Sequence, residues 1–172
     1  MDEATDLIRR YCSKRDQGAF RRFYQQESDR LWRFLVLRGC DTEQAYDVVA
    51  EAFTRFVATV CRDPAYPRAF LYRIALNLHI DLHRRAGSQG DRVGDDEFEQ
   101  LEATGQQAGL EHDIRRAMAQ LYADEQNLLL LRYWIGMTHS EIAKVIGLPA
   151  GTVRRQSAAA LHKLRTVLGG EY

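Results

Sequence analysis

The side chains best suited to chemistry lie near the C-terminus, where they open a predicted helix. They are Thr152, Arg154, Arg155 and Gln156, a few residues after Gly147. Arginine can donate two hydrogen bonds to O6 and N7 of guanine, and glutamine can pair with adenine in a similar way. Such residues at the start of a helix indicate a segment that reads base edges in the DNA major groove.

A helix-turn-helix is the element that would position these side chains, and the local sequence predicts one. Thr138 can cap the first helix, with Glu141 three residues later to complete a capping box. Gly147 can end that helix in a left-handed conformation, and Pro149 discourages its continuation. The second helix carries an apolar stripe at helical spacing, made of Val153, Ser157, Ala160, Leu161, Leu164 and Leu168. The alternative interpretation is a solvated surface helix in an ordinary bundle.

The overall composition is that of a globular protein. Of 172 residues, 45% are hydrophobic and 28% charged, and the three prolines leave helix favoured over strand. No apolar run approaches the length of a membrane span, and the N-terminus lacks a signal-peptide core. These features predict a cytoplasmic protein without membrane insertion.

Charge is distributed unevenly although the formal net charge is zero. Residues 62–92 hold six arginines against three aspartates, a net charge of +3, and residues 132–168 hold six cations against one glutamate, a net charge of +5. Residues 93–113 between them hold seven carboxylates and no Lys or Arg. Because phosphate neutralisation depends on local clusters, two basic modules joined by an acidic connector remain compatible with DNA binding.

The hydrophobic periodicity predicts helices throughout and no strands, hence an all-α fold of two small helical domains joined by a flexible acidic linker. The expected boundaries are 1–87, 88–109 and 110–172. Expected helices cover Leu7–Tyr11, Gly18–Leu37, Asp41–Cys61, Pro67–Arg85, Leu110–Leu121 and Asp124–Tyr133, followed by the helix-turn-helix. In the third of these, Ala45, Val48, Val49, Ala52, Phe53, Phe56, Val57 and Val60 form the expected buried stripe.

The helix after Pro67 has a second face of interest. Leu71, Ile74, Ala75, Leu78 and Leu82 form its expected core stripe, and a neighbouring face carries Phe70, Arg73, Asn77, Asp81 and Arg84. Cations, an amide and an aromatic ring together suit single-stranded DNA. The alternative is an ordinary solvated helix face.

The cysteines and histidines suggest structural roles. Cys12, Cys40 and Cys61 are odd in number and widely spaced, so we expect free, largely buried thiols and no zinc knuckle. His79 and His83 have a spacing that could seat a metal, but no third ligand is placed, and exposed or DNA-facing imidazoles are expected. No catalytic constellation, metal site or cofactor motif stands out.

With both modules in view, the chain resembles bacterial sigma factors of the extracytoplasmic-function (ECF) class, relatives of sigma-70 with a sigma-2 and a sigma-4 domain. The resemblance covers nearly the whole chain. It is carried by 47–53 (DVVAEAF), by 70–77 (FLYRIALN) with Asp81 and Arg84-Arg85, and by 140–143 (SEIA) through 151–155 (GTVRR). The chain departs from the common pattern at Ala50, Leu76, Ser157 and Ala159.

The resemblance implies a non-enzymatic factor that binds core RNA polymerase and directs transcription initiation. The helix with Asp47, Glu51, Thr54 and Arg55 would bind the β′ clamp, and the sigma-4 domain would meet the β flap. The region 62–85 would melt the −10 element, with Arg73, Asn77, Arg84 and Arg85 near the strand. Thr152, Arg154, Arg155 and Gln156 would read the −35 element, and an anti-sigma factor or a regulatory kinase would control the protein.

Thr54 suggests one form of control. It lies on the expected polymerase-facing side, and phosphorylation would add nearly two negative charges there, which could strengthen binding to basic clamp residues. The alternative is an unmodified surface threonine. The sequence leaves two rival functions open: a stand-alone helix-turn-helix regulator that binds its operator as a dimer, and a small helical metalloenzyme that uses His79 and His83.

Overall fold

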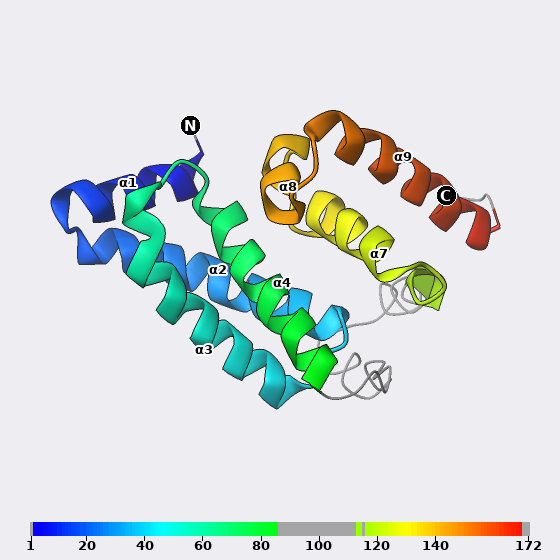
Figure 1. Cartoon of the computed structure of the whole chain (residues 1–172), viewed down its shortest axis with the longest axis horizontal. Coiled ribbons are helices and arrows are strands. Elements are labelled where there is room, and N and C mark those ends of the chain that lie inside the picture. Colours follow the sequence, from blue (N-terminus) through cyan, green and yellow to red (C-terminus); the bar gives the residue numbers. More distant parts are fainter. Residues whose placement is uncertain (1, 86–112, 115, 170–172) are drawn as a thin grey trace. The chain divides into compact units, whose positions relative to one another are not determined.

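The computed structural model describes residues 2–85, 113–114 and 116–169, and the chain divides into two compact units (Figure 1). All regular structure in these ranges is helical, which confirms the all-α prediction. The expected linker at 88–109 lies outside the described residues, and the domain boundaries stay a prediction.

The N-terminal unit consists of α1 (Glu3–Lys14), α2 (Gln17–Leu37), α3 (Thr42–Thr59), the 3-10 turn η1 (Val60–Arg62) and α4 (Pro67–Arg85). Helices α1, α2 and α3 each start after an aspartate whose side chain accepts a backbone N–H: Asp2, Asp16 and Asp41. The cap at Asp2 explains why α1 is longer than the predicted Leu7–Tyr11. Helix α1 packs against α2, and α3 packs against α2 and α4 (Figure 1).

Aromatic side chains form the centre of this unit. Phe23 and Phe56 are fully buried and stacked, with ring centroids 5.2 Å apart, and Phe34 meets Tyr72 of α4 edge-on at 5.4 Å. The predicted α3 stripe is buried except at Val57, which is 39% exposed because it lies at the edge of the stripe. The core therefore fixes α3 and α4 against α2 and leaves their outer faces to solvent.

The prediction of three free thiols is wrong for two of them. Cys12 of α1 and Cys61 of η1 form a disulfide, with Cα atoms 5.4 Å apart, and only Cys40 is a free cysteine in the described part of the chain. The two residues are 49 positions apart in sequence. Their proximity results from the packing of α1 beside the end of α3, which Cys spacing does not reveal.

The expectation of exposed imidazoles is wrong for His79. The residue is 4% exposed, its Nδ1 lies 3.1 Å from Cys40 Sγ, and its ring centroid lies 4.3 Å from that of His83. Burial, reinforced by His83, lowers the pKa of His79 to about 4. Burial also raises the pKa of the Cys40 thiol to about 12. Neutral thiol and neutral imidazole thus form a core pair at neutral pH.

His79 makes the unit sensitive to acid. Its ordinary pKa of 6.5 in the unfolded chain exceeds that in the fold, so the unfolded state takes up the proton first and stability falls as pH drops from about 6.5 toward 4. Between roughly pH 7 and pH 5 we expect this residue to lower the free energy of unfolding by about 2 kcal/mol. Urea unfolding at both pH values measures this change in unfolding free energy. His79→Asn should flatten the dependence, and an NMR titration midpoint for His79 near 6.5 would contradict the assignment.

The C-terminal unit contains α7 (Ala123–Leu129), the π-helical turn η2 (Leu130–Trp134), α8 (His139–Ile146) and α9 (Ala150–Val167). Helix α7 with η2 corresponds to the predicted Asp124–Tyr133 helix. Of the predicted Leu110–Leu121 helix, residues 113–114 and 116–118 are described and helical. Leu121, Leu129 and Ala160 form a buried cluster against which Met118, Leu161 and Leu164 pack. This cluster orients α9 on α7.

Candidate nucleic-acid interface

The predicted helix-turn-helix is present as α8, a short turn and α9. Thr138 Oγ1 accepts the N–H of Glu141 at 3.1 Å, and Glu141 Oε1 accepts the N–H of Thr138 at 3.1 Å, so the capping box is formed. Gly147 ends α8 with a φ of 82°, in the left-handed region that favours glycine. Pro149 precedes the first turn of α9 and supplies no side-chain cap. The N–H groups of that turn can therefore meet a phosphate.

Helix α9 presents the predicted base-reading residues to solvent. Arg154, Arg155 and Gln156 are exposed and Thr152 is half-buried, whereas Val153, Ser157 and Ala160 are buried. Arg155 Nη2 donates to Thr152 Oγ1 at 3.3 Å, which orients the guanidinium along the first turn. The buried residues fix the rotation of the helix. Three adjacent polar side chains are thereby held outward at its start.

Two of the basic side chains in this unit form contacts within the fold. Lys163 Nζ lies 3.1 Å from Glu125 Oε1 and 4.5 Å from the centre of the Tyr122 ring, and Arg132 Nη1 donates to the carbonyl of Met137 at 2.8 Å. The N–H of Tyr122 and then the Lys163 ammonium hold the pKa of Glu125 below its ordinary value. The net charge of residues 132–168 is therefore larger than the positive charge that DNA could contact. The start of α9 carries the more accessible cations.

In α4, the predicted face is exposed except at Phe70, which is half-buried with its ring 5.8 Å from that of Phe56, and the core stripe is rotated. Arg73, Asn77, Arg84 and Arg85 are exposed, as predicted for a DNA-facing surface. Leu71 and Ala75 are buried, but Ile74, Leu78 and Leu82 are only half-buried; Tyr72, Leu76 and His79 are buried in addition. This shift follows from the position of α4, which packs against α1, α2 and α3 and so buries a wide face.

The third predicted surface lies on α3. Asp47, Glu51, Thr54 and Arg55 are all exposed, on the side opposite the aromatic core. Arg55 Nε lies 2.9 Å from Glu51 Oε1, and Thr54 Oγ1 donates to the carbonyl of Ala50 at 2.9 Å. The hydroxyl of Thr54 therefore lies along its own helix, and the surface combines one carboxylate–guanidinium pair with the carboxylate of Asp47.

Comparison with known proteins identifies the family. The model of the family described as Sigma-70, region 4 matches residues 117–166, which include the helix-turn-helix. Over 164 residues the chain is 31% identical to the ECF RNA polymerase sigma factor SigL of Mycobacterium tuberculosis, covering 89% of this chain and 90% of that protein. The chain belongs to the ECF RNA polymerase sigma factors. Its function is to direct RNA polymerase in transcription, and the stand-alone regulator is not favoured.

Further relatives agree with this assignment. The chain is 28% identical to the ECF sigma factor RpoE of Cereibacter sphaeroides, covering 92% of this chain and 91% of the relative. Two solved structures share the fold. CnrH in complex with the cytosolic domain of CnrY has a TM-score of 0.69 at 24% identity, covering 99% and 100% of the two chains. RpoE with the anti-sigma factor NepR from Bartonella quintana has a TM-score of 0.71 at 20% identity, covering 89% and 98%.

Two further observations concern the rival functions and the membrane. Sigma factors are generally not enzymes, and within residues 2–85, 113–114 and 116–169 no group of three or more His, Cys, Asp or Glu side chains could hold a metal ion. The described helices include none whose length and apolar character would let it span a bilayer.

Proposed function

We propose that this ECF sigma factor binds core RNA polymerase through α3 and the C-terminal unit, and promoter DNA through α4 and α9. The observation that carries the proposal is the start of α9. There Arg154, Arg155 and Gln156 project from a capped helix-turn-helix whose intervening packing residues are buried. This is the arrangement needed to place side chains against base edges in a major groove.

Each of the three exposed surfaces has its own binding role. In our proposal, Thr152, Arg154, Arg155 and Gln156 read the −35 element. Arg73, Asn77, Arg84 and Arg85 hold the melted −10 strand, with the cations on the backbone and the Asn77 amide on a base edge. Asp47, Glu51, Thr54 and Arg55 bind the polymerase β′ clamp, and the C-terminal unit meets the β flap.

The proposal also covers catalysis, cellular location and control. The chain itself performs no catalysis and needs no cofactor or metal, because the polymerase supplies the chemistry. It acts in the cytoplasm, where that enzyme works. Both solved relatives were captured with a protein partner, the anti-sigma factor NepR in one case and the CnrY cytosolic domain in the other. These complexes support control of this chain by an anti-sigma factor.

Run-off transcription tests the proposal directly. Purified chain and core polymerase, mixed with a library of promoter fragments from the source genome, should yield transcripts from discrete start sites that neither protein produces alone. Binding of an operator by a dimer of the chain without polymerase would instead support the stand-alone regulator. Failure to associate with core polymerase, after removal of any inhibitor and after phosphorylation, would refute the proposal.

Thr54 offers a matched pair of variants. Both Thr54 and Thr59 lie on α3 and donate their hydroxyl to the carbonyl four residues earlier, at 2.9 and 3.0 Å. If added charge at Thr54 strengthens clamp binding, Thr54→Glu should tighten binding of core polymerase roughly 5- to 10-fold, consistent with one or more charge-assisted hydrogen bonds. Thr59→Glu should not. Fluorescence anisotropy of labelled protein measures both affinities, and normal transcription by Thr54→Ala in cells would exclude control through this residue.

A further inference from the structure

The disulfide between Cys12 and Cys61 joins two segments with very different attachment to the fold. We propose that these cysteines form a reversible thiol–disulfide switch, whose closure fixes residues 60–66 against α1 and slows promoter opening without weakening polymerase binding. The effect on promoter opening rests on the proposed function of α4. The redox reaction itself does not.

The bond is accessible from solvent. Cys61 is exposed and Cys12 is half-buried, whereas Cys40 is 2% exposed and lies against His79. Thiol–disulfide exchange needs a thiolate and an open line of approach to sulfur. Burial raises the pKa of Cys40 to about 12, so that thiol is inert at neutral pH. Among the three cysteines, the bridged pair is therefore the one that a small reagent can reach.

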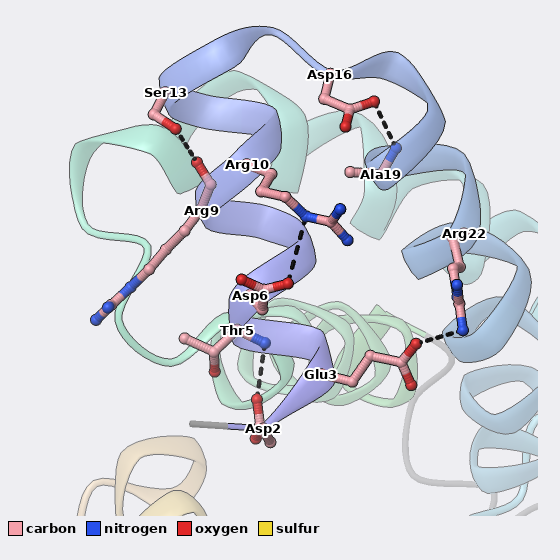
Figure 2. A network of polar contacts seen from close by, with 10 residues as sticks. All are labelled: Asp2, Glu3, Thr5, Asp6, Arg9, Arg10, Ser13, Asp16, Ala19 and Arg22. Atoms are coloured by element: carbon pink, nitrogen blue, oxygen red, sulfur yellow. Dashed lines mark hydrogen bonds and ion pairs between the residues drawn. The ribbon is translucent and has the colours of Figure 1, made fainter.

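On one side of the bond, α1 is firmly attached. Figure 2 shows Asp2 capping α1 through the N–H of Thr5 at 2.7 Å, and Arg22 of α2 reaching Glu3 at 2.7 Å. Leu7 and Ile8 are fully buried beneath the same helix. Helix α1 therefore serves as the fixed end of the bridge.

On the other side, the chain between α3 and α4 is loosely packed. Val60 is 1% exposed, but residues 61–63 and Tyr66 are exposed, and the 3-10 turn ends at Asp63 with a single backbone bond back to Val60, of 3.2 Å. Exposed backbone with few buried apolar contacts belongs to the least stable part of a fold. Reduction would leave the segment held at its two ends, by buried Val60 and by the Tyr66 carbonyl, which accepts the N–H of Phe70 at 2.9 Å, and would give residues 61–65 freedom to move.

The position of this segment links the bond to promoter opening. It leads into the first turn of α4, six residues before Arg73 on the surface proposed to hold the melted strand. Binding loops rearrange in a substantial minority of complexes, and the switch assumes such a rearrangement when the melted strand is captured. A covalent tether on the segment next to that surface opposes such rearrangement. The clamp-binding residues lie on the outer face of α3, which reduction leaves packed on its aromatic core.

A small-molecule disulfide can serve as the oxidant that forms the Cys12–Cys61 bond. One cysteine thiolate attacks a sulfur of glutathione disulfide, forms a mixed disulfide and releases glutathione. The second cysteine attacks the protein sulfur of that mixed disulfide, the Cys12–Cys61 bond forms, and a second glutathione leaves. Two thiols have lost two electrons and two protons to the oxidant. A dithiol reductant of the thioredoxin class restores the two thiols by two exchanges of the same kind and is itself oxidised to its disulfide.

Equilibration of the purified chain in glutathione buffers tests the redox reaction without polymerase. After the exchange is quenched and the protein is denatured, a maleimide that adds visible mass should label one cysteine, Cys40, in the oxidised protein and three cysteines in the reduced protein. Closure should raise the melting temperature of the N-terminal unit by about 10 °C or more, since it constrains the unfolded chain. The Cys12→Ser/Cys61→Ser double variant should lose this difference, and Cys40→Ser should retain it. A bond that cannot be reduced in the native protein, or that never forms, overturns the switch.

Open-complex formation tests the functional consequence. Oxidised and reduced chain, freed of reagent, is mixed with untreated core polymerase and a promoter fluorescent at the −10 element. The oxidised form should open the promoter on the order of tenfold more slowly, equivalent to about 1.4 kcal/mol at the barrier. Its affinity for core polymerase should be unchanged, and the double variant should behave as reduced protein under both conditions. Equal opening rates for the two forms overturn the switch, whereas no transcript from either form refutes the proposed function instead.

Discussion

Replacing Arg154 with alanine is expected to lower the affinity of the polymerase–sigma complex for its −35 element roughly 10- to 100-fold, because a bidentate arginine–guanine contact contributes about 1–3 kcal/mol of discrimination. Arg154 is exposed in the first turns of α9, and its neighbour Val153 is fully buried. Burial of Val153 fixes the rotation of the helix, so the Arg154 side chain has a defined direction at the start of α9. Fluorescence anisotropy with −35 duplexes measures the loss.

Arg165 provides the matched control for this variant. It is an exposed arginine in the last turn of the same helix, and Arg165→Ala changes the net charge by the same amount. If Arg154 reads a base, Arg154→Ala should relax sequence preference at one promoter position, whereas Arg165→Ala should change affinity less than about twofold. A uniform loss over all sequences, with the salt slope reduced by about one unit, would assign Arg154 to a phosphate instead.

Local chemistry accounts for the parts of the structure that sequence predicted well. The capping box at Thr138 and Glu141, the left-handed Gly147 and the start of α4 at Pro67 each depend on residues within one helical turn. The apolar stripe of α9 was also predictable, since it packs on one side only. The outward position of Arg154, Arg155 and Gln156 followed from that stripe, so exposure at this candidate site was available from sequence. Their contacts with DNA stay a prediction.

Packing between distant segments accounts for the features that sequence did not predict. Helix α4 lies against three helices, so its buried face includes Tyr72 and Leu76 beyond the simple 3.6-residue stripe. His79 is buried because Cys40, at the end of the α2–α3 turn, lies beside it. The Cys12–Cys61 bond likewise depends on the approach of α1 to η1. Periodicity within one helix contains no information on how many neighbours that helix will have.

Replacing Glu27 with alanine is expected to have the largest effect on stability, a loss of about 3–5 kcal/mol, because it would remove the carboxylate from a charge pair that is almost fully buried. Glu27 of α2 is 2% exposed, and its Oε1 lies 3.2 Å from Nε of Arg68, whose side chain is 12% exposed. Burial, followed by the negative charge of Glu27, raises the pKa of Tyr72 in the same region. The pair ties α2 to the first turn of α4, which leads to the proposed −10 surface.

Asp29→Ala is the control, because Asp29 on the same helix pairs with Arg33 at 3.2 Å but is 67% exposed. An exposed pair of this kind contributes about 0.3–0.5 kcal/mol. Urea unfolding followed by Trp32 fluorescence in a Trp134→Phe background reports on the N-terminal unit alone, since the chain has two tryptophans and Trp32 lies in α2. Equal losses for the two variants would mean that hydrophobic packing, rather than the buried charge pair, holds the start of α4. In that case Glu27→Ala should also leave promoter opening unchanged.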